Sequence, residues 1–355
     1  PLAGCVREGQ VGSDLARRLA RVTDLLLLEG VASGSGAVLV LGEEGVRLEC
    51  LPHLEGLDPE ATQRALVEHL GPCASLRVGP AGEAGLPLAN LAAGSDPPSY
   101  VGRGGLGAAF AARGLKALVV TAREVEPVGN ETWAALQKDS PRLAARAEGG
   151  SLELFESLAA RSALGARGGA QSVSLEEART FGDQARERVE RRHGCKGCPT
   201  PCGWVLDKPE GEGAAVGARF NALHPLGQNL GIAEIGEARD LLSCCNRLGL
   251  DAKEAGACLA LWARDRPQLW GDAVALEGLL EQMVRGEEPS YETARTTTHP
   301  SRRRRAPRSC ASTPSAAPAT SSAACTAARC RAPARADGRL RTPALRNHPP
   351  VPPCA

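Results

Sequence analysis

Three closely spaced cysteines have the clearest chemical potential in this sequence. Cys195, Cys198 and Cys202 follow the pattern C-x2-C-x3-C, with a glycine and two prolines between them. This spacing lets one loop turn around a single metal centre, because glycine and proline favour a tight loop over a regular helix. Three soft thiolates suit an iron–sulfur cluster or zinc. Backbone N–H groups in such a loop can also tune the potential of a cluster.

Zinc and inert thiols are the alternatives to an iron–sulfur cluster. Zinc would need a fourth ligand, and His193 lies two residues before Cys195. Most structural zinc sites, however, pair one C-x2-C with a second, distant pair, so we favour iron–sulfur. A disulfide is disfavoured because no secretory signal is visible, and a protein without one usually keeps its thiols reduced.

A glycine-rich turn at Gly102–Gly107 matches the pattern G-x-G-x-x-G. A dinucleotide site needs a strand directly before this pattern and a helix after it. A helix is expected over 106–112, but 95–100 does not read as a strand, so we reject dinucleotide binding. The turn would still present free N–H groups to an anion beside Arg103, which suits a phosphate-bearing cofactor. A plain loop-to-helix turn explains the spacing equally well.

A second turn, Cys245–Asp251, closes one expected helix and opens the next. Gly249 fits a left-handed position after the first helix, and Asp251 fits the N-cap of the second. These roles explain both residues without a ligand. The histidines have no partner at a telling distance, so no nucleophilic triad is supported and no catalytic residue is assigned.

The elements that must position these residues divide the chain into three regions. Residues 1–126 predict an α+β domain, with a helix over 14–21, a buried strand over 23–29, a hairpin over 37–50, a helix capped by Asp58, and strands over 75–78 and 115–121. Residues 127–290 predict an α-helical domain carrying the cysteine loop, with helices over 131–137, 141–148, 151–164, 174–193, 233–248, 252–265 and 272–285.

Residues 291–355 are a low-complexity tail of Ala, Arg, Pro, Ser, Thr and Cys. This composition cannot bury enough apolar surface to offset chain entropy, so a disordered tail without helix or strand is predicted. GC-rich codons read in a wrong frame give the same residues, so we favour a frameshifted end over a natural disordered tail.

Overall composition excludes several classes of function. The net charge is only +1, and eleven arginines of 301–355 leave the rest of the chain acidic, so nucleic acid is not an expected partner. The apolar run 25–28 is too short to span a bilayer, so no membrane association is expected. Without a visible signal segment, a cytoplasmic protein is predicted, and because the chain begins without Met its start is expected to be missing.

Five stretches together resemble the tungsten-containing aldehyde:ferredoxin oxidoreductase family. In the family's order they are Gly79–Glu83, Gly102–Ala108 followed by 114–117, Cys195–Gly203, Leu226–Ile232, and Cys245–Asp251 with Gly256. Each stretch is weak alone, but the ordered set spans roughly residues 8–288. The resemblance implies a partial β-rich cofactor-base domain followed by a helical domain, and a tungsten or molybdenum bis-pterin beside a 4Fe–4S cluster.

The resemblance also assigns roles to individual residues. It places Cys195, Cys198 and Cys202 on the cluster as three thiolates. It places Arg103, Gly104 and Gly105 against the cofactor, and Asn246, Leu250 and Asp251 as pterin contacts. Asn246 replaces the usual aspartate of this motif and keeps a hydrogen-bonding carbonyl without the charge.

Three departures from the family pattern are visible. The family's fourth cluster cysteine lies in a later motif that is not found here, and its first segment is missing, so the chain resembles an internal fragment. Asn221 stands where the family often has a glutamate, and an amide cannot exchange a proton.

The predicted function is therefore oxidation of a small aldehyde to a carboxylate, with ferredoxin as electron acceptor; a homodimer is a possible assembly. This chain by itself is expected to be inactive. The alternatives are a stand-alone iron–sulfur electron-transfer module and a non-functional gene remnant.

Overall fold

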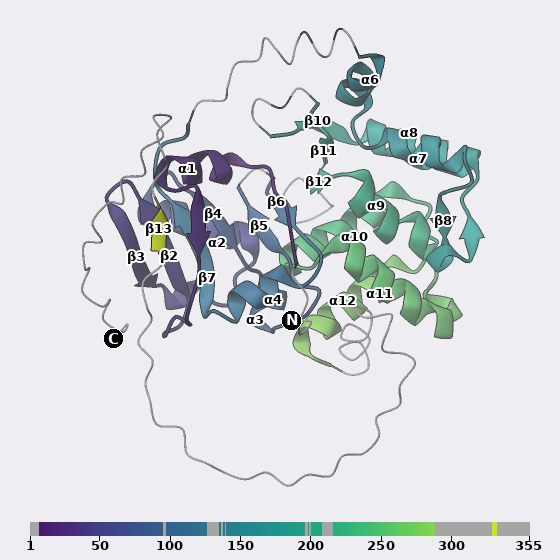
Figure 1. The fold of residues 1–355 in the computed structure, drawn as a ribbon. Coiled ribbons are helices and arrows are strands. Elements are labelled where there is room, and N and C mark those ends of the chain that lie inside the picture. Colours follow the sequence, from purple (N-terminus) through teal and green to yellow (C-terminus); the bar gives the residue numbers. More distant parts are fainter. Residues whose placement is uncertain are drawn as a thin grey trace.

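The computed structural model of the protein describes residues 7–94, 97–125, 135, 138, 140–195, 198, 200–207, 216–287 and 329–331. Two parts lie side by side (Figure 1). We call residues 7–125 the base, which contains a large sheet, and residues 140–287 the body, which is mainly helical. The α+β fold class predicted from the sequence is confirmed.

The base is built on one mixed sheet. Its strands are β2 (Ala37–Gly42), β3 (Gly45–Cys50), β4 (Ala74–Arg77), β5 (Leu91–Ala93), β6 (Ser99–Val101) and β7 (Leu115–Val120), and its helices are α1 (Asp14–Val22), η1 (Pro52–Leu54), α2 (Pro59–Leu70), α3 (Pro80–Glu83) and α4 (Leu106–Ala111). The order is β3-β2-β7-β4-β5-β6. The predicted hairpin is β2 and β3, with Leu39 opposite Leu48, and β2 also pairs in parallel with β7.

Helices cover both faces of this sheet, which explains why β2 is apolar along its whole length. Leu39 and Leu41 pack in a cluster with residues of α1 and α4. Val38 and Val40 point to the other face and pack with Leu66 of α2. Asp58 caps α2 as predicted, because its carboxylate accepts the N–H groups of the first helical turn at 2.8 Å.

The body packs its helices around one core. Its helices are α6 (Pro141–Gly149), α7 (Glu153–Ala159), η2 (Arg167–Gly169), α8 (Leu175–Glu187), α9 (Phe220–Leu226), η3 (Gln228–Leu230), α10 (Ile235–Leu248), α11 (Ala252–Asp265), η4 (Pro267–Leu269) and α12 (Ala273–Arg285), and its short strands are β8 (Gly165–Ala166), β9 (Gln171–Ser172), β10 (Val189–His193), β11 (Gly203–Leu206) and β12 (Val216–Ala218). The core is mainly aliphatic and includes the buried rings of Phe155 and Phe181. The helix expected over 131–137 lies largely outside the described residues.

The body contains more strand than the sequence predicted. The helix expected over 174–193 ends at Glu187, and Val189–His193 instead form β10, which pairs with β11 in the three-stranded sheet β10-β11-β12. Pairing with a segment ten or more residues later decides this conformation, and helix propensity is too weak a preference to oppose it. The cysteine loop is therefore the connection of a β-hairpin and not a break between two helices.

The first strand and the tail also differ from expectation. β1 (Leu25–Leu27) is a strand as predicted, but Leu25 is 66% exposed and Leu27 54%, so it is not buried. It pairs antiparallel with β13 (Arg329–Arg331), which contradicts the prediction of a tail without strands. Such pairing uses backbone groups, so an argument from apolar composition does not forbid it. The rest of the tail lies outside the described residues. Among the helices that the structure describes, none has the length and apolar character to cross a bilayer.

A short backbone ladder joins the base to the body. The N–H of Asn90 donates to the carbonyl of Gly249 at 2.9 Å, and the N–H of Asp251 donates to that of Leu88, also at 2.9 Å. Gly249 and Gly79 meet backbone to backbone, since a Cβ atom on Gly249 would lie 2.8 Å from the Cα of Gly79. These contacts hold the turn after α10 against the base.

Acidification should destabilise the body through His224. Its ring stacks on Phe220 with centroids 5.4 Å apart, and Nε2 donates to the carbonyl of Gly165 at 2.8 Å. Burial lowers the pKa of His224 below 6.5, although the Gly165 bond opposes this. Between the folded and unfolded pKa values the unfolded chain binds more protons, so the free energy of unfolding falls as pH drops through that window.

Urea unfolding of the wild type and of His224→Gln at about pH 7.5 and about pH 5 tests this prediction. One proton contributes at most about 1.4 kcal/mol per pH unit to the slope of the free energy of unfolding against pH. The variant should lose part of the slope, whereas His53→Gln, at an exposed position, serves as the control. An unchanged slope in His224→Gln would contradict the prediction.

Candidate functional site

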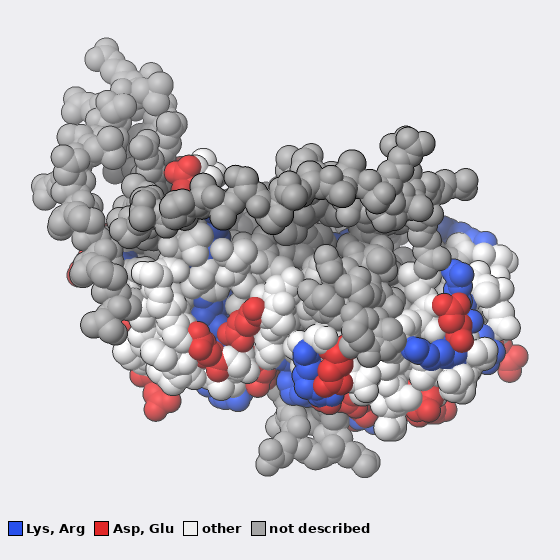
Figure 2. Space-filling model, turned by 90° about the horizontal axis from the view of Figure 1, so that it is seen from below, with Lys and Arg blue, Asp and Glu red and all other residues white. Residues whose placement is uncertain are grey.

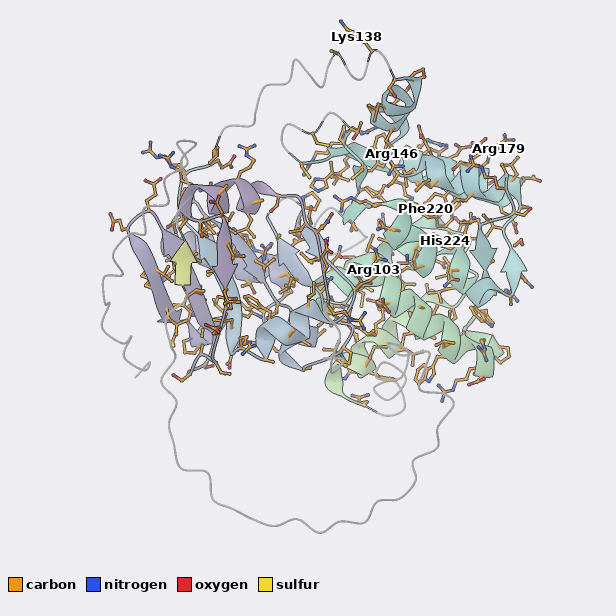
Figure 3. All side chains as sticks on the ribbon, viewed as in Figure 1. Arg103, Lys138, Arg146, Arg179, Phe220 and His224 are labelled. Carbon is orange, nitrogen blue, oxygen red and sulfur yellow. The ribbon has the colours of Figure 1, made fainter. Side chains whose placement is uncertain are left out.

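A cavity of about 690 Å³ lies between the base and the body. The base contributes the segment 7–10, Asn90, Tyr100 and the glycine-rich turn 102–104. The body contributes the start of α9, the end of α10 and the first residues of α11. Figure 3 shows Arg103 on the base side, where the two parts meet. The cavity wall is thus assembled from segments far apart in the sequence.

The glycine-rich turn lies between a strand and a helix. β6 ends at Val101 and α4 begins at Leu106, so our reason for rejecting dinucleotide binding, the lack of a preceding strand, was wrong. The rejection itself stands on topology. β6 is an edge strand antiparallel to β5, and β7, which follows α4, is not its neighbour, so no parallel βαβ unit surrounds the turn.

Arg103 adopts a backbone conformation that is unusual for a side chain. Its φ is 54°, and its N–H donates to Oδ2 of Asp251 at 3.2 Å. A non-glycine residue in this region is strained and persists only where the surroundings hold it. Gly102 makes room for the approach, because a Cβ atom there would lie 1.5 Å from Oδ2 of Asp251. The turn is therefore held by the body as well as by the base.

Asp251 has both of its carboxylate oxygens engaged. Oδ1 caps α11 by accepting the N–H of Glu254 at 2.8 Å, as the sequence predicted. Oδ2 accepts the N–H of Arg103 from the base. Gly249 adopts a φ of 76° at the end of α10, as predicted. The helix-capping explanation is thus correct but incomplete, because both residues also join the base to the body.

The residues predicted as cofactor contacts lie close together. Arg103, Gly104, Asn246, Leu250 and Asp251 all line the cavity, whereas Gly105 does not belong to its wall. Asn221, noted for replacing a glutamate, lines the same cavity. Their roles as cofactor contacts stay a prediction. Sequence reasoning missed further charged and polar residues of the wall, which belong to no recognised motif: Arg7, Glu8, Gln10, Asn90, Tyr100, Arg219, Lys253 and Glu254.

The cavity wall is polar and carries charges of both signs. Burial, and then the charge of Asp251, raise the pKa of Glu254, against the effect of Arg103 and Lys253. Three atoms of the wall residues are buried without a hydrogen-bond partner among the described residues: Oδ1 of Asn90, Oη of Tyr100 and Nε of Arg219. The charged and polar side chains that line the cavity fit a polar ligand.

The cysteine loop connects β10 to β11. Cys195 and Cys198 are exposed and Cys202 is half-buried, and none of the three is in a disulfide. The N–H of Cys198 donates to the carbonyl of Cys195 at 2.9 Å, which tightens the turn. Burial raises the pKa of Cys195, and the neighbouring Cys198 and Cys202 raise it further. Thiols that interact in this way suit a positively charged metal centre, which would stabilise their thiolate forms.

Two arginines flank the loop. Arg192 lies over the ring of Trp204, 3.9 Å from its centroid, and donates to the carbonyl of Pro201. Arg219 lines the cavity, and its Nε would lie 3.4 Å from a Cβ atom on Gly203, the residue after Cys202. Arg219 also opposes the rise in the pKa of Cys195. The loop and the cavity are therefore neighbours, with Arg219 between them.

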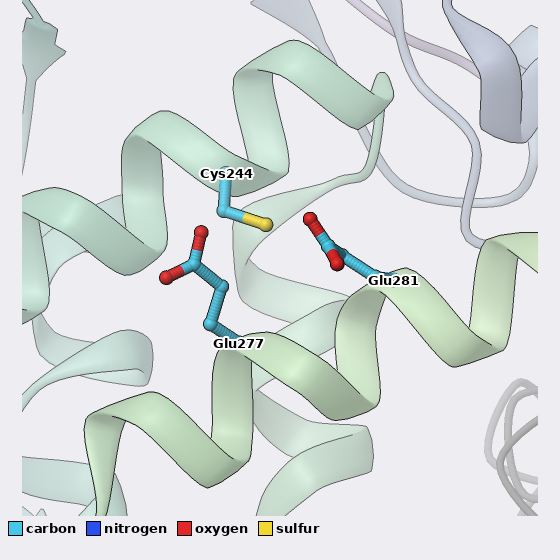
Figure 4. Close-up of side chains that lie close together, drawn as sticks. All are labelled: Cys244, Glu277 and Glu281. Carbon is cyan, nitrogen blue, oxygen red and sulfur yellow. The ribbon is translucent and has the colours of Figure 1, made fainter. Parts of the chain in front are cut away.

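A second group of potential metal ligands has a simpler explanation. Cys244 of α10 and Glu277 and Glu281 of α12 place their ligand atoms within 4.8 Å of one another (Figure 4). Arg247 pairs with both carboxylates, at 3.6 and 2.9 Å. Burial, then Glu277, raises the pKa of Cys244 to about 12, so its thiol stays protonated. The arginine balances the acids without a metal.

The described surface mixes charges of both signs. On the face seen in Figure 2, basic and acidic side chains lie interspersed. Several exposed charges are paired with a charge of the opposite sign, such as Arg179 with Glu156 and Arg188 with Asp207. On this face the described charges therefore form no patch of a single sign.

The fold and the site define a two-part protein, in which a polar cavity between an α+β base and a helical body lies beside a loop of three cysteines. Comparison with known families agrees. Residues 1–122 match the N-terminal domain of aldehyde ferredoxin oxidoreductase, and residues 130–304 match its domains 2 and 3. The chain belongs to the aldehyde ferredoxin oxidoreductase family.

Two curated relatives carry the same name, tungsten-containing aldehyde ferredoxin oxidoreductase. The protein of Pyrococcus furiosus is 23% identical over 336 residues, which cover 84% of this chain and 54% of the relative. The protein of Thermococcus kodakarensis is 25% identical over 248 residues, covering 67% of this chain and 40% of the relative. The chain thus spans about half the length of these relatives.

A solved structure shares the fold. The active site complex BamBC of benzoyl coenzyme A reductase, in complex with 1,5-dienoyl-CoA, matches with a TM-score of 0.59 and 18% identity, over 74% of this chain and 45% of that one. At this identity the likeness concerns the arrangement of the elements only.

Proposed function

We propose that this chain provides the cofactor cavity and the cluster loop of a tungsten- or molybdenum-dependent aldehyde oxidoreductase. One observation carries the proposal: residues from two distant motifs line a single cavity next to the three-cysteine loop, namely Arg103 from the first and Asn246, Leu250 and Asp251 from the second. The charged and polar side chains of the cavity wall fit a polar, pterin-type cofactor. The family to which the chain belongs supports the same chemistry.

Named residues have separate tasks in this proposal. Cys195, Cys198 and Cys202 hold a 4Fe–4S cluster, and Arg103 and Lys253 offer positive charge to phosphate groups of the cofactor. When bound, the metal–pterin supplies two-electron oxidation of a small aldehyde to a carboxylate, with water as oxygen source and ferredoxin taking the electrons through the cluster.

The side chains of the cavity also limit where a proton can be held. The amide of Asn221 cannot take up or release one. Glu254 lines the same cavity as a carboxyl group that can exchange a proton, and burial raises its pKa. Proton transfer in the proposed reaction is therefore assigned to the Glu254 carboxylate.

Loss of one loop cysteine should abolish cluster binding. After anaerobic reconstitution with iron and sulfide, the wild type should bind about four irons per chain, with the visible absorption of an iron–sulfur centre. Cys198→Ser should lose most of this iron, because two thiolates cannot hold a cluster against solvent. Cys258→Ala, a buried thiol of α11 outside the loop, is the matched control and should keep it.

Metal analysis then separates the possible functions. Tungsten or molybdenum together with iron in protein purified from a suitable host supports the proposal. Iron alone would favour a stand-alone electron-transfer module. Full iron content in Cys198→Ser, or zinc in place of iron, would refute the cluster assignment.

A further inference from the structure

The base contacts the cysteine loop at Gly12. A Cβ atom on Gly12 would lie 2.0 Å from Sγ of Cys195 and 3.4 Å from its Cβ atom. Atoms that are not bonded to each other do not approach to 2.0 Å, so the thiol occupies the place where a side chain of residue 12 would begin. The first cysteine of the loop therefore lies directly against the backbone of the base.

The backbone conformation of Gly12 does not account for the glycine. Its φ lies outside the positive range, unlike that of Gly104 and Gly105 in the glycine-rich turn, so an alanine could adopt this conformation without strain. What a side chain at this position would disturb is the contact with Cys195. Glycine is the usual residue where a backbone must come close to a ligand.

Residues on both sides hold Gly12 in place. Val11 packs against the core of the base. The hydroxyl of Ser13 caps α1 by accepting the N–H of Leu15 at 3.1 Å, and Leu15 is buried in the same core. In the other direction the segment continues into residues 7–10, which line the cavity. One anchored stretch of the base therefore reaches both the cavity and the cysteine loop.

The side chain of Cys195 is free to move as long as it binds no metal. Cys195 is exposed, and its thiol can turn about a single bond into another rotamer. Coordination removes this freedom, because a thiolate that ligates a metal must keep its sulfur on that metal. A side chain at position 12 would therefore cost little in the free chain and much more once the loop holds a cluster.

We propose that Gly12 is part of the cluster site, and that the base leaves room there for the Cys195 thiolate and the metal bound to it. This rests on the proposed function, which places an iron–sulfur cluster on the loop. The cluster site is then formed at the joint between the base and the body, and not by the body alone. None of the sequence motifs includes Gly12.

Gly12→Ala tests the proposal through iron retention. After anaerobic reconstitution with iron and sulfide, the variant should release iron to a chelator about tenfold or more faster than the wild type, the usual scale of effect when a methyl group enters a filled space. Urea unfolding of the cluster-free chains should show nearly equal stability, because the free Cys195 thiol can turn away. Gly278→Ala is the control. An added Cβ atom there meets nothing within 4 Å, so iron release should not change.

Hydrogen exchange of the wild type gives a second measurement that needs no variant. The N–H groups of Gly12 and Ser13 have no hydrogen-bond partner among the described residues, so they should exchange rapidly in the cluster-free chain. Reconstitution should slow their exchange several-fold. Gly9 of the same segment lies against Val101 of β6, whereas the turn at 43–44 between β2 and β3 is at the opposite edge of the sheet, so exchange in that turn should stay the same.

Each contrary result has a distinct meaning. If the wild type binds a cluster but Gly12→Ala releases iron at the wild-type rate, or exchange at residues 12–13 does not slow, the inference is overturned while the proposed function stands. A large loss of stability in cluster-free Gly12→Ala would assign Gly12 to the packing of the base and would also overturn it. If the wild type binds no cluster, the cluster assignment of the proposed function fails, and the inference fails with it.

Discussion

Replacing Arg77 with methionine should destabilise the base by about 3 kcal/mol or more, because it leaves several buried acceptors unpaired. Arg77 is fully buried, and among the described residues no carboxylate accepts a hydrogen bond from it. Its guanidinium instead donates to backbone carbonyls, of Pro59 at the start of α2 and of Gly94 after β5 at 2.7 Å, and to the side chain of Gln63 at 3.1 Å. It thereby ties three segments of the base together.

The expected loss is smaller than the sum of these bonds. A buried guanidinium is itself costly to desolvate, and burial lowers the pKa of Arg77 to about 10. Methionine removes that cost but satisfies none of the acceptors. Urea unfolding measures the difference, with Arg47→Met as control, since Arg47 forms an exposed pair with Glu49 that contributes at most about 1 kcal/mol. Equal losses for the two variants would mean that the Arg77 bonds add nothing net.

Gly249→Ala should be almost as damaging, by about 3 kcal/mol, for two separable reasons. The first is backbone strain, because φ is 76° and an alanine there costs about 1–2 kcal/mol. The second is a clash with the backbone of Gly79, whose Cα would lie 2.8 Å from the new Cβ atom. Neither backbone can move without opening the joint between the base and the body.

Two further glycines separate the reasons. Gly286 ends α12 with a φ of 74° and has nothing within 4 Å of an added Cβ atom, so Gly286→Ala should show the strain alone. Gly79 has a φ of −95°, so Gly79→Ala should show the clash alone. The loss measured for Gly249→Ala should approach the total of the two. A value no larger than that of Gly286→Ala would show that the joint adapts freely.

Local signals in the sequence predicted the parts of the fold that depend on neighbouring residues. The cap at Asp58, the turn at Gly249 and Asp251, and the hairpin of β2 and β3 all follow from side chains within a few positions of each other. β6 and β10 did not follow in this way, because Tyr100 or Arg191 becomes part of a strand only through a partner strand elsewhere in the chain. Strand preference of this kind depends on tertiary context.

The residues of the candidate site were likewise predicted only in part from the sequence. The resemblance to a family predicted Arg103 and Asn246 as contacts of one cofactor, and in the structure both line one cavity. Asn90, Tyr100 and Arg219 belong to separate segments and share no motif, so only their arrangement in space reveals that all three line one cavity. Wall residues of this type can be identified only from the folded structure.

The joint between base and body also bears on the order of events during folding. The hydrogen bond from Arg103 to Asp251 links residues 148 positions apart, and that from Asn90 to Leu250 links residues 160 apart. Contacts at such sequence separation repay their loop-closure cost only when they form, so we expect them to form late. We therefore expect hydrogen exchange at the amides of Arg103, Asn90 and Asp251 to report docking of the base against the body, and a cofactor to find its complete binding site only after that step.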